Sequence, residues 1–346
     1  MTDSNFLLEL DTQPMEAKAV DRLPYGDQWQ FEPKWDGFRC LVFKSGDAVD
    51  LRAKSGKSLS RYFPEMIAAL QTVRLNHFVL DGELTVPSGD TLSFDALQAR
   101  IHPAASRVMR LAAETPALLI LFDCLATAEA NSLLQSPLTD RRAHLEDLAG
   151  RLKPNSRMRL TPMTRERVEA ERWLETTHGA LDGIVAKRVD APYAAGERAM
   201  FKVKRLRSAD CVVGGFRYES GTKQAGSLLL GLFDGTGKLN HVGFTSSISD
   251  ADRPALTARL EIFRGGPGFT GDAPGAPSRW STERSAAWVP LRPDLVVEVS
   301  YDHVTGGRFR HGTKLLRWRP DKAPHQCTVE QLEQELRPGR LIEAIL

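Results

Sequence analysis

The chain has 346 residues, of which 42% are hydrophobic and 26% charged, and its formal net charge is +2. These values are typical of a globular protein of two domains and exclude an intrinsically disordered chain. The N-terminal stretch is acidic where a secretory signal would be basic, and no apolar run approaches the ~18 residues of a membrane span. We therefore expect a cytoplasmic protein with no membrane partner.

The first half of the chain mixes short strands and helices without a regular βαβ repeat. Residues 38–57 predict a hairpin that turns at Ser45-Gly46-Asp47. Apolar runs predict two strands, and spaced apolar residues predict three helices. The strands are expected at 78–86 and 117–125, and the helices at 64–73, 139–148 and 164–177. This mixture favours an α+β domain over a doubly wound sheet.

The second half, after about Lys204, is rich in predicted strands and in glycine-containing turns. Apolar strand-like runs occupy 211–218, 226–244 and 294–304, and one clear helix is predicted at 249–263. This pattern is typical of a small Greek-key barrel such as an OB-fold. We place the domain boundary near residues 205–209, which gives domains of residues 1–205 and 206–346.

Basic residues gather in two short runs inside this nearly neutral chain. Residues 198–207 contain five lysines and arginines, and residues 308–322 contain six, against the single acid Asp321. Such runs indicate a polyanionic partner, although a merely solvated face has the same composition. Charge alone leaves both readings open.

The segment EPKWDGFRC, residues 32–40, is the first candidate for a chemical role, because Lys34 stands two residues before an aspartate. The pattern KxDGxR arises by chance in well under ~1% of chains of this length. Further along, LDGEL puts Asp81 and Glu83 on one face of a strand, and FKVK does the same for Lys202 and Lys204. Each segment alone is more readily explained as a turn or a solvated strand face, but together they favour a chemical site.

This ordered series resembles the covalent nucleotidyltransferases, and most closely the ATP-dependent DNA ligases. The segments similar to their motifs I, III, IIIa, IV, V and VI are KWDGFR, LDGEL, LFDCL, LDGIVAK, MFKVK and RWRPDK. RYFPE, LQARIHPAASR and GSLLLGLF further resemble the small bacterial ligase C and the ligase domain of bacterial end-joining ligases. The resemblance runs from about Trp29 to the C-terminus. It implies an adenylation domain of antiparallel sheets and flanking helices, followed by an OB-fold β-barrel domain.

The resemblance also implies a reaction in three steps. Lys34 attacks the α-phosphorus of ATP, AMP then passes to the 5′-phosphate at a DNA nick, and the 3′-hydroxyl finally displaces AMP. A free lysine is almost fully protonated near neutral pH, so a lysine nucleophile needs neighbours that favour its neutral form. The cations Lys202 and Lys204 would do so.

Further roles follow from the same resemblance. Phe122 is expected to stack on adenine, Glu32 to read the base edge, and Arg198 with Lys204 to meet the phosphate. Carboxylates are expected to hold Mg²⁺ or Mn²⁺, which prefer oxygen ligands and substrate phosphates. The metal set is Asp36, Glu83 and Asp182, with Glu83 and Arg39 also near the ribose. The nucleotide-binding set is Glu32, Lys34, Trp35, Arg39, Lys54, Glu83, Phe122, Lys187, Arg198, Lys202 and Lys204. The catalytic set is Lys34, Asp36, Lys202, Lys204, Arg319, Asp321 and Lys322.

Two residues depart from the family pattern. Lys54 stands where the family commonly has an arginine. The planar guanidinium of an arginine can donate two parallel hydrogen bonds, whereas the ammonium of a lysine acts as a single compact charge. Asp182 stands where glutamate is more frequent and is one methylene shorter.

The expected partner is nicked duplex DNA, bound without regard to sequence by a monomer. Contacts to its phosphates are assigned to Arg205, Arg207, Arg217 and Lys223. Residues 1–28 are too few for a separate helical DNA-binding domain, so we expect the two domains to hold the duplex and repair or end-joining proteins to assist. The setting would be DNA repair at the bacterial nucleoid. Two alternatives remain, an RNA ligase or mRNA-capping-type nucleotidyltransferase, and an inactive OB-fold protein that binds nucleic acid.

Overall fold

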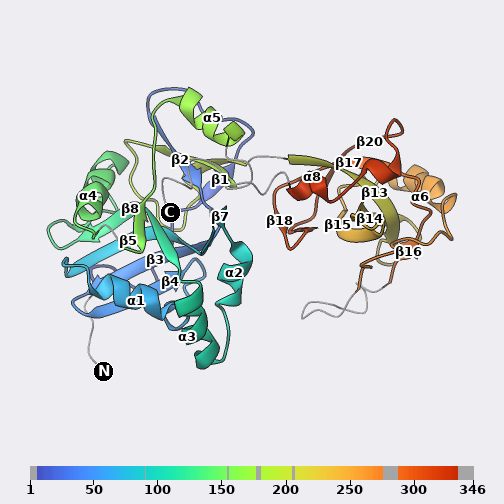
Figure 1. Cartoon of the computed structure of the whole chain (residues 1–346). Helices are drawn as coiled ribbons and strands as arrows, with labels where there is room; N and C mark the ends of the chain where they lie inside the picture. Colours follow the sequence, from blue (N-terminus) through green and yellow to red (C-terminus); the bar gives the residue numbers. More distant parts are fainter. Residues whose placement is uncertain are drawn as a thin grey trace. The chain divides into compact units, whose positions relative to one another are not determined.

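The computed structural model describes residues 6–89, 91–153, 156–176, 181–204, 207–275 and 287–333. Within these ranges the chain forms two compact units, the first ending at Lys204 and the second beginning at Arg207 (Figure 1). The predicted boundary near 205–209 lies partly outside the described residues and stays a prediction. No helix of the described ranges is long and apolar enough to span a membrane.

Two sheets form the first unit. The smaller sheet has the strand order β1 (Ala17–Ala19), β12 (Met200–Lys204), β11 (Gly183–Arg188), β2 (Trp29–Lys34). The larger has the order β10 (Met158–Leu160), β8 (Leu118–Thr127), β5 (His77–Thr85), β3 (Phe38–Ser45), β4 (Ala48–Ala53), with β9 (Asn131–Ser132) beside β8. The pairs are antiparallel except at two edges, where β1–β12 and β10–β8 are parallel. The prediction of antiparallel sheets therefore holds for the interior pairs, and the long connections between those edge partners allow a parallel pairing.

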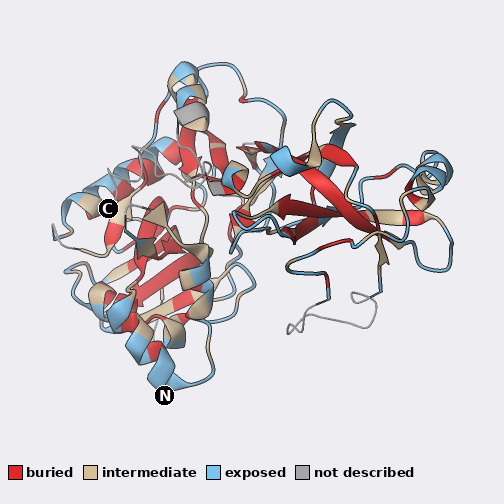
Figure 2. Ribbon diagram, turned by 45° about the vertical axis from the view of Figure 1, so that its right-hand side comes forward, coloured by how far each residue is buried: buried red, intermediate tan, exposed pale blue. Residues whose placement is uncertain are grey.

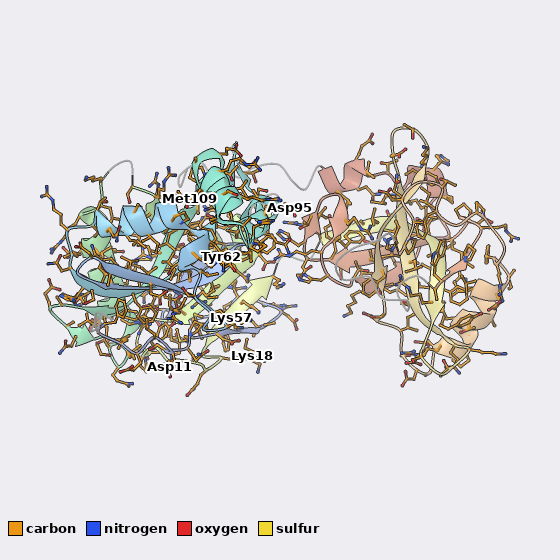
Figure 3. The ribbon with its side chains drawn as sticks, turned by 90° about the horizontal axis from the view of Figure 1, so that it is seen from below. Asp11, Lys18, Lys57, Tyr62, Asp95 and Met109 are labelled. Atoms are coloured by element: carbon orange, nitrogen blue, oxygen red, sulfur yellow. The ribbon has the colours of Figure 1, made fainter. Side chains whose placement is uncertain are left out.

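The helices of the first unit include the three that the sequence predicts and two that it does not. The predicted ones are α1 (Pro64–Gln71), α4 (Leu138–Gly150) and α5 (Arg167–Thr176), and the others are α2 (Phe94–Ala99) and α3 (Ala105–Glu114). Short elements complete the unit: η1 (Ser60–Tyr62), β6 (Pro87–Ser88) and β7 (Thr91–Leu92). Pro64 occupies the first turn of α1, where its missing N–H costs nothing. Helices α2 and α3 carry exposed side chains, among them Asp95 and Met109 (Figure 3), and α2 has only six residues, too few for a strong periodic signal.

The larger sheet is buried on both faces. Alternate residues of β3 point to opposite sides, so Val42 joins the core beneath α1 and α4, while Leu41 and Phe43 join a second core with Tyr193 and Met200. Figure 2 shows the buried strands at the centre of the unit and exposed helical faces outside. Burial on both faces explains why these strands read as continuous apolar runs.

A buried arginine joins two of the segments that suggested ligase C. Arg100 is 0% exposed, and its two terminal nitrogens donate to the two carboxylate oxygens of Glu65 at 2.7 and 2.8 Å. They also donate to the carbonyls of Tyr62 and Thr115. Glu65 accepts a further bond from the amide of Ala117 at 3.0 Å. The arginine of LQARIH and the glutamate of RYFPE thus form one ion pair that links these two segments.

Replacing Arg100 with methionine is expected to lower the free energy of unfolding by about 3–5 kcal/mol, because the largely buried carboxylate of Glu65 would lose its ion-pair partner. Chemical denaturation measures the loss. Arg110→Met is the control, since Arg110 pairs with Glu114 on an exposed helical face and should change stability little. Equal, small losses in the two variants would contradict a stabilising role for the Arg100–Glu65 pair.

The second unit is a curved six-stranded sheet with the order β15 (Leu239–Thr245), β14 (Ala225–Phe233), β13 (Arg207–Tyr218), β17 (Val296–Tyr301), β20 (Lys314–Trp318), and with the short strand β16 (Val289–Pro290) also beside β13. The neighbouring strands are antiparallel. The outermost strands meet at one parallel bridge, where the amide of Thr313 donates to the carbonyl of Phe244 at 3.0 Å. The remaining elements are β18 (Val304–Thr305), β19 (Arg308–Phe309), α6 (Arg253–Glu261), η2 (Pro324–Gln326) and α8 (Glu330–Glu333). This is the predicted OB-type arrangement, but the strand ladder is not closed, so the barrel is partly open.

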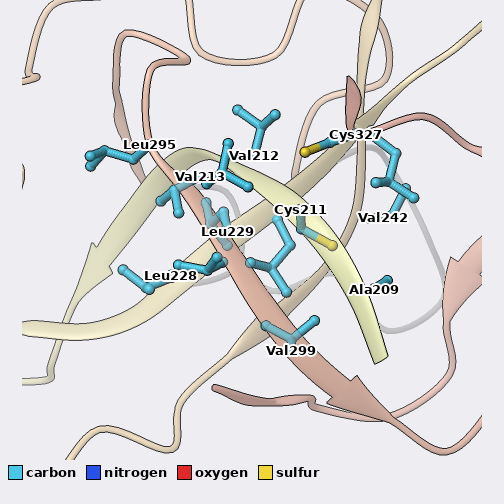
Figure 4. Close-up of a cluster of buried hydrophobic side chains, with 14 of the residues drawn as sticks. Ala209, Cys211, Val212, Val213, Leu228, Leu229, Val242, Leu295, Val299 and Cys327 are labelled. Atoms are coloured by element: carbon cyan, nitrogen blue, oxygen red, sulfur yellow. The ribbon is translucent and has the colours of Figure 1, made fainter. Parts of the chain in front are cut away.

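The core of the second unit lies inside this curved sheet. Cys211, Val213, Leu229 and Val299 are buried there (Figure 4). Register shifts interrupt the ladders within β13, β14 and β17. Such bulges increase local twist, which allows the sheet to wrap around one core.

His241 is a buried titratable group in this core. It lies edge-on to Phe269, and Nη2 of Arg308 donates to its Nδ1 at 2.6 Å. Burial lowers the pKa of His241 to about 3, and the charges of Arg308 and Arg217 act in the same direction. The imidazole is therefore neutral in the folded protein.

Acidification is expected to destabilise the protein through His241. In the unfolded chain the imidazole takes up a proton near pH 6.5, so the stabilisation is complete above pH 6.5 and is lost as the pH falls toward about 3. Between pH 6.5 and 5 the loss should be about 2 kcal/mol. Unfolding of the wild type and His241→Gln would be compared at pH 8 and 5, and the variant should lose less. Parallel pH dependences would show that His241 does not contribute.

Candidate active site

Strand register brings the candidate nucleophile and its neighbours together. Gly183 of β11 pairs with Lys34 on β2 and with Lys204 on β12, so the three residues form one row across the sheet. Gly183 has φ +146°, and a Cβ there would lie 2.1 Å from the carbonyl oxygen of Val203. Only glycine fits that close approach. The glycine of LDGIVAK therefore fixes the spacing of the row.

Asp182 contacts two of the lysines. The amide of Asp182 donates to the carbonyl of Lys34 at 3.0 Å. Its carboxylate lies 2.5 Å from Nζ of Lys34 and 3.7 Å from Nζ of Lys204. Burial lowers the pKa of the adjacent Lys202, and the charges of Lys34 and Lys204 add to the effect. Three lysines, Lys34, Lys202 and Lys204, therefore lie close together here.

A cavity lies beside this row and is lined by residues of both sheets. Most of the predicted nucleotide-binding residues line it, while Arg198 and Lys204 do not. The predicted ones are Glu32, Lys34, Trp35, Arg39, Lys54, Glu83, Phe122, Lys187 and Lys202. Residues 14–17 form another wall of the cavity. The sequence did not predict this wall, because nothing in its composition marks it as part of a site.

At one end of the cavity, a buried ion pair joins β2 and β11. Nζ of Lys187 lies 2.8 Å from Oε2 of Glu32 and donates to the carbonyl of Phe122 at 3.0 Å. Nε2 of Gln30 donates to Oε1 of Glu32 at 2.8 Å. Both carboxylate oxygens therefore have a fixed donor, and the orientation of Glu32 is defined. The sequence had not indicated Gln30.

Phe122 lies among cations. The guanidinium carbon of Arg39 is 4.6 Å from the centre of its ring, and Nζ of Lys187 is 4.8 Å away. These are distances of cation–π attraction. Phe122 also lines the cavity.

Arg39 belongs to a closed ring of hydrogen bonds. Its Nε and Nη2 donate to the two oxygens of Asp81 at 2.5 Å, and the hydroxyl of Tyr193 donates to Asp81 at 2.6 Å. The amide of Met15 donates to the Tyr193 hydroxyl at 2.9 Å, and the carbonyl of Met15 accepts from Nη2 of Arg39 at 3.1 Å. This ring ties the wall at residues 14–17 to β3 and β5 of the larger sheet and to Tyr193, which lies in the chain between β11 and β12. Arg39 was expected near the ribose and is here bonded to Asp81 and Met15.

The three expected metal ligands do not form a ready-made site. Among the described residues, no three His, Cys, Asp or Glu side chains gather closely enough to hold a metal ion. Asp182 is engaged by Lys34 and Lys204. Burial raises the pKa of Glu83 to about 7, against the opposing charges of Lys34 and Arg39. The carboxylate oxygens suit Mg²⁺ chemically, but an ion would need substrate phosphates to complete its coordination.

Lys54 and Arg198 share one acid. Nζ of Lys54 lies 2.9 Å from Oε1 of Glu16, and Nε of Arg198 lies 3.8 Å from Oε2. The hydrogen bond from Lys54 lowers the pKa of Glu16. Both cations are largely exposed, with side-chain exposures of 58% and 75%. They are held at the mouth of the site by an acid that the sequence did not identify.

In the second unit, the predicted residues Arg319, Asp321 and Lys322 lie together after β20. Arg319 contacts Asp321 through Nε and Nη2 at 2.9–3.1 Å. Nη1 of Arg319 and Nζ of Lys322 contact the two oxygens of Asp210 at 2.8 and 2.6 Å. The basic side chains of this motif are therefore held as a pair.

The expected DNA contacts differ in accessibility. Lys223 is exposed in the β13–β14 turn, and Arg217 is half-buried. Arg207 is only 5% exposed, because it begins β13 within the sheet beside Tyr301 of β17, so its expected role as an accessible phosphate contact is not met by this structure. Arg205 lies outside the described residues.

The first unit has a lysine-rich cavity lined by both of its sheets, and the second unit is of the OB type. This combination is typical of a two-domain nucleotidyltransferase. The chain matches the ATP dependent DNA ligase domain over residues 14–204 and the ATP dependent DNA ligase C terminal region over residues 221–322. The chain therefore belongs to the ATP-dependent DNA ligases.

Individual relatives agree with this assignment. DNA ligase C1 of Mycolicibacterium smegmatis is 44% identical over 94% of each chain. DNA ligase C of Mycobacterium tuberculosis is 40% identical over 93% of this chain and 94% of its own. The solved ligase domain of M. tuberculosis LigD is 28% identical, with a TM-score of 0.50 over 92% of this chain and 98% of that one. The predicted likeness to ligase C and to the ligase domain of end-joining ligases is confirmed.

Proposed function

We propose that this ligase seals nicks in duplex DNA with Lys34 as the residue that carries AMP. The observation that carries the proposal is the row of Lys34, Gly183 and Lys204 beside the cavity, with Asp182 at 2.5 Å from the Lys34 amine. In the first step the Lys34 nitrogen forms a bond to the α-phosphorus of ATP, and the bond to pyrophosphate breaks. Asp182 is placed to accept the proton that the amine loses.

Choice of nucleotide is assigned to the buried end of the cavity. Glu32 offers fixed acceptor oxygens, which suit the exocyclic amino group of adenine and disfavour the carbonyl oxygen of guanine. Phe122 offers an aromatic surface nearby. We therefore expect ATP to be strongly preferred over GTP.

The phosphates are assigned to cations of both units. Lys202, Lys204, Lys54 and Arg198 supply positive charge beside the cavity, and Arg319 and Lys322 would orient the departing pyrophosphate. When Mg²⁺ is bound by the phosphates together with Asp36 or Glu83, it would neutralise the negative charge that develops on the phosphate oxygens. Loss of pyrophosphate is favoured because each of these groups stabilises negative charge.

The proposed DNA substrate is bound through its phosphates and without sequence preference, by a monomer that repair or end-joining proteins assist. Lys223 and Arg217 are the described side chains proposed for these contacts. Phosphate contacts position a duplex but carry no sequence information.

The test offers the protein labelled ATP or GTP with Mg²⁺ and then a nicked duplex whose strands at the nick are DNA or RNA. The expected result is a covalent label from ATP alone, followed by sealing of the DNA nick. Label from GTP, or sealing that requires RNA at the nick, would favour a capping-type enzyme or an RNA ligase. Binding of the duplex without any covalent label would indicate the inactive nucleic-acid-binding alternative.

A further inference from the structure

The two cations of the C-terminal motif converge on one acid from a distant part of the chain. Asp210 lies on β13 and is 9% exposed. Its Oδ1 accepts from Nη1 of Arg319 at 2.8 Å, and its Oδ2 accepts from Nζ of Lys322 at 2.6 Å. Each carboxylate oxygen therefore holds one cation.

Asp210 is itself fixed at both backbone groups. Its amide donates to Oε1 of Gln331 at 3.1 Å, and its carbonyl accepts from Nε2 of Gln331 at 3.1 Å. The backbone of the motif is also anchored, since the amide of Arg319 donates to the carbonyl of Val296 at 2.9 Å. The carboxylate is thus a rigid point between two longer and more flexible side chains.

We propose that Asp210 is a positioning residue for the adenylation step, which holds Arg319 and Lys322 side by side as a paired cation for the phosphates of ATP. The inference rests on the proposed function of the motif. Two adjacent cations repel each other, and one shared carboxylate offsets that repulsion at a fixed spacing. The ammonium of Lys322 has three donors and the guanidinium of Arg319 has five, so both keep N–H groups for phosphate oxygens.

A neighbouring acid provides a matched control. Glu298 on β17 is the direct cross-strand partner of Asp210. Its carboxylate lies 2.7 Å from Arg317 and 3.9 Å from Arg319. The two acids therefore share a location, but only Asp210 accepts hydrogen bonds from both Arg319 and Lys322, whereas Glu298 accepts one from Arg317.

The experiment measures two reactions of the full-length protein, namely formation of the covalent AMP adduct as ATP is varied, and sealing of a nick that already carries 5′-AMP. Asp210→Asn should slow adduct formation about 10- to 100-fold, because the phosphate-binding cations are misplaced, while sealing of the adenylated nick changes little. Glu298→Gln should retain both reactions. Asp210→Glu keeps the buried charge but moves it by one methylene, so it should fold and still slow adduct formation.

Further variants separate this inference from the proposed function. If Lys322→Ala and Arg319→Ala leave adduct formation intact, the proposed role of the motif fails. If they impair it while Asp210→Asn and Asp210→Glu do not, the positioning role of Asp210 is overturned. Equal loss of both reactions in the two Asp210 variants would also overturn it, because a purely structural role predicts that result.

Discussion

Replacing Lys34 with alanine is expected to abolish covalent uptake of label from ATP, by at least about 1,000-fold, because the attacking amine is removed and no water can form the same adduct. Lys34→Arg should fail as completely, since the guanidinium stays protonated and cannot attack. Denaturing electrophoresis of protein incubated with labelled ATP and Mg²⁺, without DNA, measures the adduct. Sealing of a nick that already carries 5′-AMP should survive in Lys34→Ala, because that step does not need the amine as nucleophile.

The control for this prediction is Lys57→Ala. Lys57 is exposed on the same unit and does not line the cavity (Figure 3). It should retain full labelling. Label on the Lys34→Ala protein at the level of Lys57→Ala would show that another residue carries AMP, and would overturn the assignment of EPKWDGFRC as the adenylation motif.

The parts of the site that the sequence predicts are those set by the period-two alternation of a strand. Lys202 and Lys204 alternate with buried residues on β12, and Lys34 precedes a hairpin. Local rules fix such features, because a strand has period two whatever surrounds it.

Long-range pairings could not be predicted in this way. Tyr193 and Asp81 are 112 residues apart, and Met15 and Tyr193 are 178 apart. The pairing of Asp210 with Lys322 spans 112 residues. No periodic pattern connects such positions, since tertiary packing alone chooses the partner of a buried polar group.

Shared faces also do not establish shared ligands. Asp81 and Glu83 occupy one face of β5, yet Asp81 holds Arg39 and Tyr193 while Glu83 lines the cavity. Among the described residues no three acids gather as a metal set, and Asp182 lies close to Lys34 and Lys204 instead. Sequence spacing gives the direction of a side chain but not the charge of its neighbours.

Nick binding is expected to weaken about 1,000-fold between 50 and 200 mM salt, because each phosphate contact releases roughly 0.9 counterions and about six contacts suffice for that slope. Two nicked duplexes of unrelated sequence should give the same slope, since phosphate contacts do not read bases. Fluorescence anisotropy across a salt series measures it. A different salt slope for one of the two duplexes would indicate that the protein contacts the bases.

Two single variants test which bases contribute to this salt dependence. Lys223 is exposed, so Lys223→Ala should reduce the slope by about 1 and weaken binding to every sequence alike. Arg207 is 5% exposed, so Arg207→Ala should lower the free energy of unfolding and leave the slope unchanged. A reduced slope in Arg207→Ala would mean that β13 exposes this guanidinium when DNA binds. An unchanged slope in Lys223→Ala would remove the β13–β14 turn from the DNA path, and a flat salt dependence in the wild type would remove phosphate contacts as the main source of affinity.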